Sequence, residues 1–185
     1  MNYYQLLNYY FLRLVLLGCI TCSMAFAQVV DLSGKAGNPL KSAKIIVLIF
    51  IRTDCPISNR YAPEIKRLAE KYQSRNLKFF LVYPGTDQSP ELIKKHLVAF
   101  AFQVEAVRDP QLQLVKSLSV SVTPEAVVLK EGQMIYRGRI DNRFVGFGKM
   151  RTAPTLHDLE QVLEAVRQGK TVTKKTTKAI GCFIS

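Results

Sequence analysis

The sequence lacks the patterns that identify most common enzyme classes. Its 185 residues contain no glycine-rich phosphate loop, because Gly146-Phe147-Gly148 does not stand between a strand and a helix. A serine on a strand-to-helix elbow is also missing. These absences remove most enzyme classes from consideration.

Histidine is scarce as well. The two histidines, His96 and His157, lie within helical patterns, and neither has a second histidine or a cysteine at the spacing of a metal-ligand pair. We therefore expect both rings to lie on the surface or in the core packing. No metal and no other cofactor is expected.

A membrane-spanning run is absent, although the N-terminal segment is apolar. In the first 27 residues Arg13 is the only charge, Leu14–Leu17 begins a short apolar stretch, and Ala25-Phe26-Ala27 offers a small-x-small cleavage site before Gln28. The apolar stretch is shorter than the roughly 20 residues that a spanning helix needs. Residues 1–27 are therefore predicted to be a cleaved export signal, which places the mature protein in the periplasm or outside the cell.

A second cleavage pattern lies inside the same segment. Leu16-Leu17-Gly18-Cys19 resembles a lipoprotein box, in which Cys19 becomes the acylated first residue. The second leucine of the box is atypical, so we favour export without an anchor. In the lipoprotein alternative, Cys19 attaches the protein to a membrane, and no other membrane contact is expected.

Few cysteines remain in the predicted mature chain. Removal of the signal takes away Cys19 and Cys22 and leaves Cys55 and Cys182, which form a candidate pair in an oxidising compartment. The loss of Arg13 from 26 basic residues leaves a net charge of +11. The basic residues are scattered, without interleaved aromatic residues, so we interpret the charge as a solubilising surface and expect no nucleic-acid partner.

The pattern of strands and helices predicts an α/β fold. Residues 45–53 read as a strand that is apolar on both faces, which is typical of a central parallel strand. The alternation of strands and helices implies a mainly parallel sheet covered by helices on both faces, and a C-terminal hairpin adds antiparallel edge strands before the last helix. Further strands are expected at 77–83, 104–107, 126–129 and 134–137, and helices at 59–74, from Ser89 to about Phe100, at 112–118 and from Thr155 to 168. We divide the chain into a signal (1–27), a polar lead-in segment (28–44), one domain (45–168) and a basic tail that carries Cys182 (169–185).

Cys55 stands where the first core strand ends and a helical pattern begins. The free N–H groups and the positive dipole end of a helix stabilise a thiolate over a thiol. Arg52 or Arg60 would lower the pKa of this thiol further, whereas Asp54 would raise it. We therefore predict a reactive nucleophile that is reachable from outside, with a buried structural cysteine as the alternative.

The element order, with a cysteine after the first core strand and Val122-Thr123-Pro124 before the hairpin, resembles the thioredoxin fold over most of residues 45–168. The residues around Cys55 are similar to the bacterial redoxin branch of the alkyl hydroperoxide reductase and thiol-specific antioxidant superfamily. This resemblance implies a thioredoxin-like three-layer sandwich and a thiol-based activity. The segments that carry it are Thr53–Ile65, Thr123–Ala126, Tyr136–Arg143 and Gly181-Cys182.

Two positions differ from better-known relatives. A dithiol thioredoxin carries Cys-x-x-Cys, but Ser58 occupies the second position here, so the usual local disulfide cannot form. A typical peroxiredoxin has threonine three residues before its reactive cysteine, and this sequence has Arg52 there. Ser58 is expected to cap the helix or to donate a hydrogen bond to the Cys55 sulfur.

The resemblance assigns further roles. Pro124 in the cis form would face Cys55 and keep a backbone edge at Thr123 open to an extended substrate peptide, because proline cannot donate to a further strand. A flexible tail can return Cys182 to the site, where it would resolve a sulfenic acid or a mixed disulfide on Cys55. A static disulfide or a free thiol near the terminus is the equally weighted alternative.

The charged turn after the hairpin has two interpretations. Arg139 or Arg143 would bind an anionic substrate or face the thiolate, and both are kept as candidate substrate-binding residues. Pairing of these arginines with nearby aspartates at the surface is the more frequent meaning of such a run.

Three functions are compatible with these residues. The leading hypothesis is an exported thiol–disulfide oxidoreductase that acts on thiols or disulfides of other exported proteins, with an unidentified thiol as electron donor. The second is a thiol peroxidase, an antioxidant enzyme that uses Cys55 against peroxides. The third is a non-catalytic binding module, or a copper carrier built from the two cysteines and a histidine, although the Cys-x-x-x-Cys of thioredoxin-fold copper chaperones is absent.

Overall fold

The computed structural model describes residues 29–173 and 175–184, and the predicted export signal lies outside them. A seven-stranded mixed sheet forms the centre, in the order β2-β1-β5-β4-β3-β7-β8. Strands β3, β4 and β5 are parallel, and β7 and β8 form the expected antiparallel hairpin. The remaining two strands, β1 and β2, pair antiparallel at the far edge. The bounds are β1 Val29–Val30, β2 Ala36–Gly37, β3 Ile45–Phe50, β4 Leu77–Pro84, β5 Glu105–Asp109, β7 Glu125–Lys130 and β8 Gln133–Gly138.

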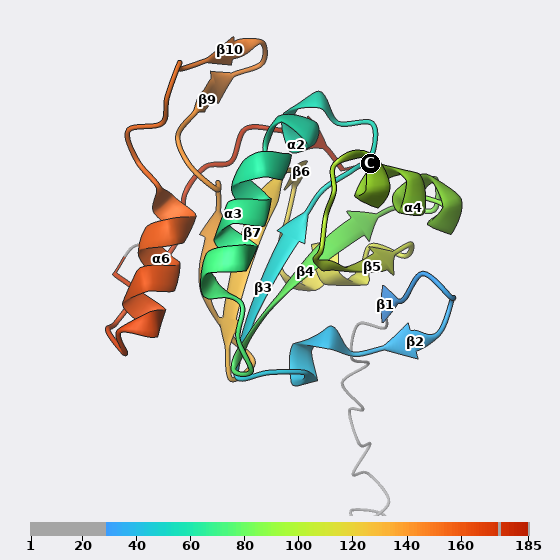
Figure 1. Cartoon of the computed structure of the whole chain (residues 1–185), viewed down its shortest axis with the longest axis horizontal. Coiled ribbons are helices and arrows are strands. Elements are labelled where there is room, and N and C mark those ends of the chain that lie inside the picture. Colours follow the sequence, from blue (N-terminus) through green and yellow to red (C-terminus); the bar gives the residue numbers. More distant parts are fainter. Residues whose placement is uncertain (1–28, 174, 185) are drawn as a thin grey trace, which may run out of the picture.

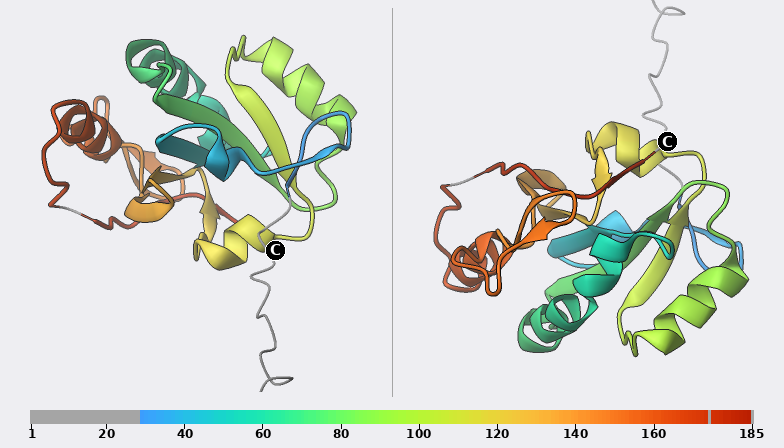
Figure 2. Two further views of the ribbon diagram at one scale, coloured as in Figure 1. Left: turned by 90° about the horizontal axis from the view of Figure 1, so that it is seen from below. Right: turned by 90° about the horizontal axis from the view of Figure 1, so that it is seen from above.

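Helices cover both faces of this sheet (Figures 1 and 2). On one face lie α3 (Ala62–Tyr72), α4 (Pro90–Ala99) and α6 (Asp158–Arg167), whose buried residues share one cluster with residues of β3, β4, β7 and β8. On the other face lies α5 (Gln113–Ser117), whose Leu114 and Val115 join a second buried cluster. The predicted α/β class and thioredoxin-like three-layer arrangement are therefore confirmed. Within the described ranges, no helix has the length and apolar character that a bilayer crossing requires.

The helix predicted at 59–74 is wrong in its bounds. The chain forms a short helix α2 (Pro56–Arg60) and then α3, and Tyr61 connects the two. Because Pro63 has no N–H to donate, it is accommodated only in the first turn of a new helix. Ser58 therefore lies inside α2 instead of capping a helix, and Cys55 itself takes the N-cap position.

The last helix also starts later than predicted. Thr155 was expected to cap it, but α6 begins at Asp158 and His157 occupies the cap without a side-chain hydrogen bond. The reason is Asn142, whose Oδ1 accepts from the main-chain N–H groups of Thr155 and Leu156 at 2.8 and 3.0 Å. Residues 155 and 156 are therefore held in an extended approach to the helix.

The final segments form two small additional sheets. Strands β9 (Phe144–Gly146) and β10 (Lys149–Met150) make a short hairpin between β8 and α6. The last strand, β11 (Cys182–Phe183), pairs antiparallel with β6 (Val122–Thr123), the strand that leads into β7. This pairing carries the C-terminal tail back across the molecule to the start of α2 (Figure 1).

Candidate active site

The Cys55 thiol is the centre of the candidate site. After β3, the chain turns and enters α2 with Pro56 as its first residue, so that Cys55 is left with extended backbone at the helix N-terminus. Its Sγ accepts a hydrogen bond from the main-chain N–H of Ser58 at 3.4 Å. Ser58 therefore reaches the sulfur through its backbone amide, which the first turn of α2 directs at it. Its buried hydroxyl has no hydrogen-bond partner among the described residues, so the expected hydrogen bond from this hydroxyl to the sulfur is not formed.

Cys182 lies against this sulfur although 127 positions separate the two residues. The Sγ atoms of Cys55 and Cys182 are 2.7 Å apart, and both residues are free thiols. A displacement of less than about 1 Å would bring them to the roughly 2.05 Å of a disulfide bond. The structure thus places the second cysteine where it can close a bond to the first.

The surroundings of Cys55 and Cys182 shift the pKa values of the two thiols in opposite directions. Burial alone would raise the pKa of Cys55, but hydrogen bonds from Cys182 and Ser58 outweigh it, and the net pKa lies below the usual value. Burial and the neighbouring Cys55 raise the pKa of Cys182 to about 12. Cys55 is therefore the more acidic thiol of the pair, and Cys182 is the thiol that holds its proton more strongly.

Cys55 is not open to solvent, contrary to the prediction. Only 1% of its surface is exposed, since it belongs to a buried core cluster against which Cys182 also packs. It does lie beside the proline loop: the Thr123–Pro124 peptide bond is cis, as predicted, and the carbonyl oxygen of Thr123 is 3.1 Å from the Cys55 Sγ. The hydroxyl of Thr123 is buried and has no hydrogen-bond partner among the described residues.

The arginines expected to lower the pKa of Cys55 bind elsewhere. The guanidinium of Arg52 forms ion pairs with Asp54 and Asp87. A guanidinium N–H of Arg60 donates to the sulfur of Met150 at 3.5 Å. Neither arginine is among the main groups that shift the pKa of Cys55, whereas the charge of Arg52 lowers the pKa of Cys182.

The two candidate substrate arginines have contacts away from the cysteines. The Nε of Arg139 donates to the carboxylate of Asp158 at 2.7 Å, which ties the turn after β8 to the start of α6. The main-chain N–H of Arg143 donates to Asp141, whose Oδ1 also accepts from the hydroxyl of Tyr61. Arg139 is thus engaged in the aspartate pairing that is frequent in such turns, and it joins two elements of the fold.

The histidines do not approach the two cysteines. His96 is buried in α4, with its ring nitrogens bound to the hydroxyl of Tyr83 and the side chain of Asn59. His157 has one ring nitrogen within 4.8 Å of carboxylate oxygens of Glu64 and Asp141, and this is the one group of potential metal ligands in the described part of the chain. Both oxygens of Glu64 already accept from Arg67. No group of ligands that would hold copper combines either cysteine with a histidine in the same ranges.

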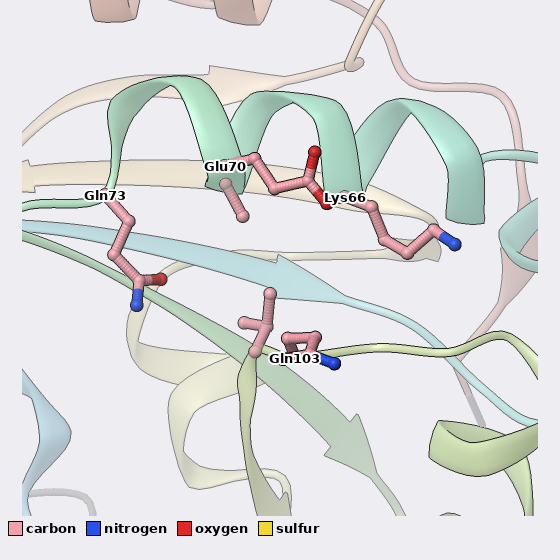
Figure 3. A pocket seen from close by; sticks show the side chains of 6 residues that line it. Lys66, Glu70, Gln73 and Gln103 are labelled. Carbon is pink, nitrogen blue, oxygen red and sulfur yellow. The ribbon is translucent and has the colours of Figure 1, made fainter.

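One cavity lies away from the sulfur atoms (Figure 3). It has a volume of about 230 Å³ and is lined by polar side chains of α3 and of the loop before β5. Lys66, Glu70, Gln73 and Gln103 provide most of this lining. No residue of the candidate site contributes to it, so it is separate from the thiol chemistry.

The fold and the paired thiols define a thioredoxin-like protein with a cysteine-based site. A family model described as thioredoxin-like matches residues 42–135, about half of the chain, and the chain belongs to this family. It is a thioredoxin-fold redoxin, as the resemblance implied, and membership supports thiol–disulfide oxidoreductase chemistry at the level of the family. None of the curated proteins matches it.

Solved structures share the fold at low sequence identity. An uncharacterised conserved protein from Geobacillus kaustophilus is 22% identical, with a TM-score of 0.73 over 85% of this chain and 87% of that one. A hypothetical protein from Sinorhizobium meliloti is 21% identical, with a TM-score of 0.72 over 85% and 88%. A secreted disulfide oxidoreductase from Mycobacterium tuberculosis is 16% identical, with a TM-score of 0.53 over 75% and 94%. At these identities the similarities show a shared fold and nothing about activity.

Proposed function

We propose that the protein is an exported thiol–disulfide oxidoreductase in which Cys55 attacks and Cys182 resolves. The observation that carries the proposal is the 2.7 Å approach of two free thiols of opposed acidity beside a cis-proline loop. A thiolate is the form that attacks a disulfide, and a nearby thiol is needed to release the product. Cys55 has the lowered pKa that favours the attacking thiolate, and Cys182 is the nearby thiol that can release the product.

The reaction proceeds in two exchanges. The Cys55 thiolate attacks one sulfur of a client disulfide, so that a Cys55–client disulfide forms and the other client sulfur leaves as a thiolate that takes up a proton. Cys182 then loses its proton and attacks the Cys55 sulfur, which forms the Cys55–Cys182 disulfide and releases the second client thiol. The client gains two electrons, and a dithiol donor must reduce the internal disulfide before the next cycle. With clients that are dithiols, the same steps run in reverse.

Export and domain organisation belong to the same proposal. Residues 1–27 would direct the chain out of the cytoplasm, and residues 45–168 would form the redoxin domain, with the segment 169–185 delivering Cys182. The secreted Mycobacterium tuberculosis oxidoreductase supports an exported setting, because its fold is shared. Clients would then be thiols or disulfides of other exported proteins.

A thiol peroxidase is the weaker candidate. It would use the same Cys55, oxidised by a peroxide to a sulfenic acid that Cys182 closes to a disulfide with loss of water. Arg52 stands in the place of the peroxiredoxin threonine, and its guanidinium is held by Asp54 and Asp87. We therefore rank disulfide exchange first.

Variants of the two cysteines test the proposal. With a protein disulfide as substrate and a dithiol as electron donor, Cys55→Ser is expected to abolish reduction. Cys182→Ser is expected to accumulate a mixed disulfide between Cys55 and the client, visible by non-reducing mass spectrometry. Peroxide consumption that depends on Cys55, without any reduction of protein disulfides, would favour the peroxidase instead. Unaltered client reduction by Cys55→Ser would refute both.

A further inference from the structure

The C-terminal tail is attached to the sheet before it reaches the two cysteines. Residues 175–177 lie beside β8, the strand at the end of the sheet opposite β2. The main-chain N–H of Arg137 donates to the carbonyl of Lys175 at 2.9 Å, and the N–H of Thr177 donates to the carbonyl of Arg137 at 3.1 Å. The tail therefore adds a short parallel segment to this edge strand. We call residues 175–177 the anchor.

A ring of three hydrogen bonds holds the side chain of Thr177. The hydroxyl of Tyr136 donates its single proton to the carbonyl of Arg139 at 2.6 Å. In its 2.7 Å contact with the Thr177 hydroxyl, the Tyr136 oxygen must therefore accept, and Thr177 donates. The Thr177 oxygen in turn accepts from the main-chain N–H of Arg139 at 3.0 Å. Because Tyr136 is fully buried, the ring ties the anchor to the core of the domain.

Gly138 allows this close approach. A Cβ atom on residue 138 would lie 2.8 Å from the main-chain nitrogen of Thr177, and nearer still to its carbonyl and hydroxyl oxygens. The φ of Gly138 is +152°, a conformation that residues with side chains rarely adopt. The end of β8 therefore accommodates Thr177 because residue 138 is glycine.

The tail beyond the anchor is packed more loosely. Residues 178–181 border an open groove of about 460 Å³. The strand β11 that follows them pairs through only two residues, and the ring of Phe183 is 76% exposed. We call residues 178–184 the arm. Since the arm has fewer contacts to lose, it can move while the anchor stays on β8.

The proposed reaction requires such a movement. A client sulfur that bonds to Cys55 needs the place beside its Sγ, where the Sγ of Cys182 lies at 2.7 Å. Cys182 must therefore move aside for the first exchange and come back for the second. How fast it comes back depends on the length of chain between Cys182 and the nearest fixed point.

We infer that Thr177 is a positioning residue that fixes the length of this arm. The inference rests on the proposed function and adds to it the part of the tail that stays in place. Five positions separate Thr177 from Cys182, and ten separate Cys182 from Val172, the preceding tail residue that packs against the core in the described part of the chain. The frequency with which two chain ends meet falls about threefold for each doubling of the length between them.

A chromogenic aromatic disulfide, added in equal amount to the reduced mature protein, measures the two exchanges separately. The Cys55 thiolate attacks one sulfur, forms a Cys55–aryl disulfide and releases a first coloured thiolate, at a rate that rises with the reagent concentration. Cys182 then gives its proton to water and attacks the Cys55 sulfur. The Cys55–Cys182 disulfide forms and a second coloured thiolate leaves, at a rate that does not depend on the reagent concentration.

The variant Thr177→Val removes the hydroxyl and keeps the branched shape of the side chain. It is expected to slow the second release about threefold or more, and to leave the first release at least as fast as in the parent protein. Thr177→Ser keeps the hydroxyl and is expected to restore the parent rate. Tyr136→Phe removes the acceptor of the ring and is expected to slow the second release as well. Thr176→Val, at the exposed neighbouring threonine, is the matched control and is expected to behave like the parent protein.

The outcomes separate this inference from the proposed function. A second release that is unchanged in Thr177→Val, or slowed equally in Thr177→Ser or Thr176→Val, would overturn the inference and leave the proposed function standing. A parent protein that releases only one coloured thiolate would refute the proposed function, and the inference with it.

Discussion

Replacement of Arg139 by methionine separates a structural arginine from a substrate-binding one. The side chain of Asp158 is 1% exposed, and that of its partner Arg139 is 25% exposed, with 2.7 Å between Nε and Oδ2. Arg139→Met removes the guanidinium and leaves its apolar stem, so the buried carboxylate of Asp158 loses this ion pair. We expect the loss to fall on folding stability.

The size of the loss follows from the burial of the carboxylate. Breaking a buried ion pair from one side costs about 3–5 kcal/mol. Asp158 lies in the first turn of α6, where the helix dipole offsets on the order of 0.5–1 kcal/mol of this cost. A net loss of about 3 kcal/mol corresponds to a fall in Tm of about 9 °C for a domain of this size.

Thermal unfolding and client reduction together decide the outcome. Arg139→Met is expected to lower Tm by this amount and to keep its disulfide-reductase activity at 25 °C. Adding Asp158→Asn is expected to restore part of the loss, because the buried charge is then gone. Arg167→Met, which removes a solvent-exposed pair with Glu164 on the same helix, is the control and is expected to leave Tm unchanged. An unchanged Tm with at least tenfold lower activity would show that Arg139 binds substrate and that the reasoning is wrong.

Three further predictions concern the site and its supports. Cys182→Ala is expected to raise the pKa of Cys55, because the hydrogen bond with the Cys182 side chain is the main interaction that lowers this pKa and alanine has no donor. The alkylation profile of Cys55 then shifts to higher pH, and an unshifted profile contradicts this. Tyr61→Phe removes a buried hydrogen bond to Asp141 and is expected to cost about 1–2 kcal/mol in urea unfolding, and no change in the midpoint would refute it. Arg67 lowers the pKa of Glu160 to about 2. The ionised Glu160 therefore contributes to stability above its ordinary pKa near 4.5, and this contribution is lost as the pH falls towards 2. Glu160→Gln is expected to remove that part of the acid sensitivity, and an identical acid-unfolding curve would contradict this.

Local patterns in the sequence were sufficient to predict the fold and the position of Cys55, one of the two cysteines of the site. The run at residues 45–53 has apolar residues on both faces, and that pattern arises only where a strand is covered on both sides. The hairpin expected between the strands at 126–129 and 134–137 is also present, and its turn residues Glu131 and Gly132 both adopt positive φ. Cys55 could be singled out because a strand-to-helix junction is visible in neighbouring residues.

Interactions between distant segments could not be predicted in this way. At the break between α2 and α3, the hydroxyl of Tyr61 donates to Asp141, 80 positions later, and no local pattern indicates this contact. The late start of α6 depends on Asn142, and no capping pattern near Thr155 indicates it. In each case several polar side chains are possible partners, and only the packing of the folded chain determines which one forms the hydrogen bond.

The amino-acid sequence by itself determined the sheet, its helices and the placement of a cysteine at a helix N-terminus, because these follow from periodicity and from contacts between near neighbours. Only the tertiary structure decided that Cys182 meets Cys55 and that the tail covers the site. The physical reason is that the pairing of β11 with β6 depends on backbone groups at an open edge and on the small size of Gly181. Backbone groups are the same in every residue except proline, so the sequence of the tail does not show which strand edge it pairs with.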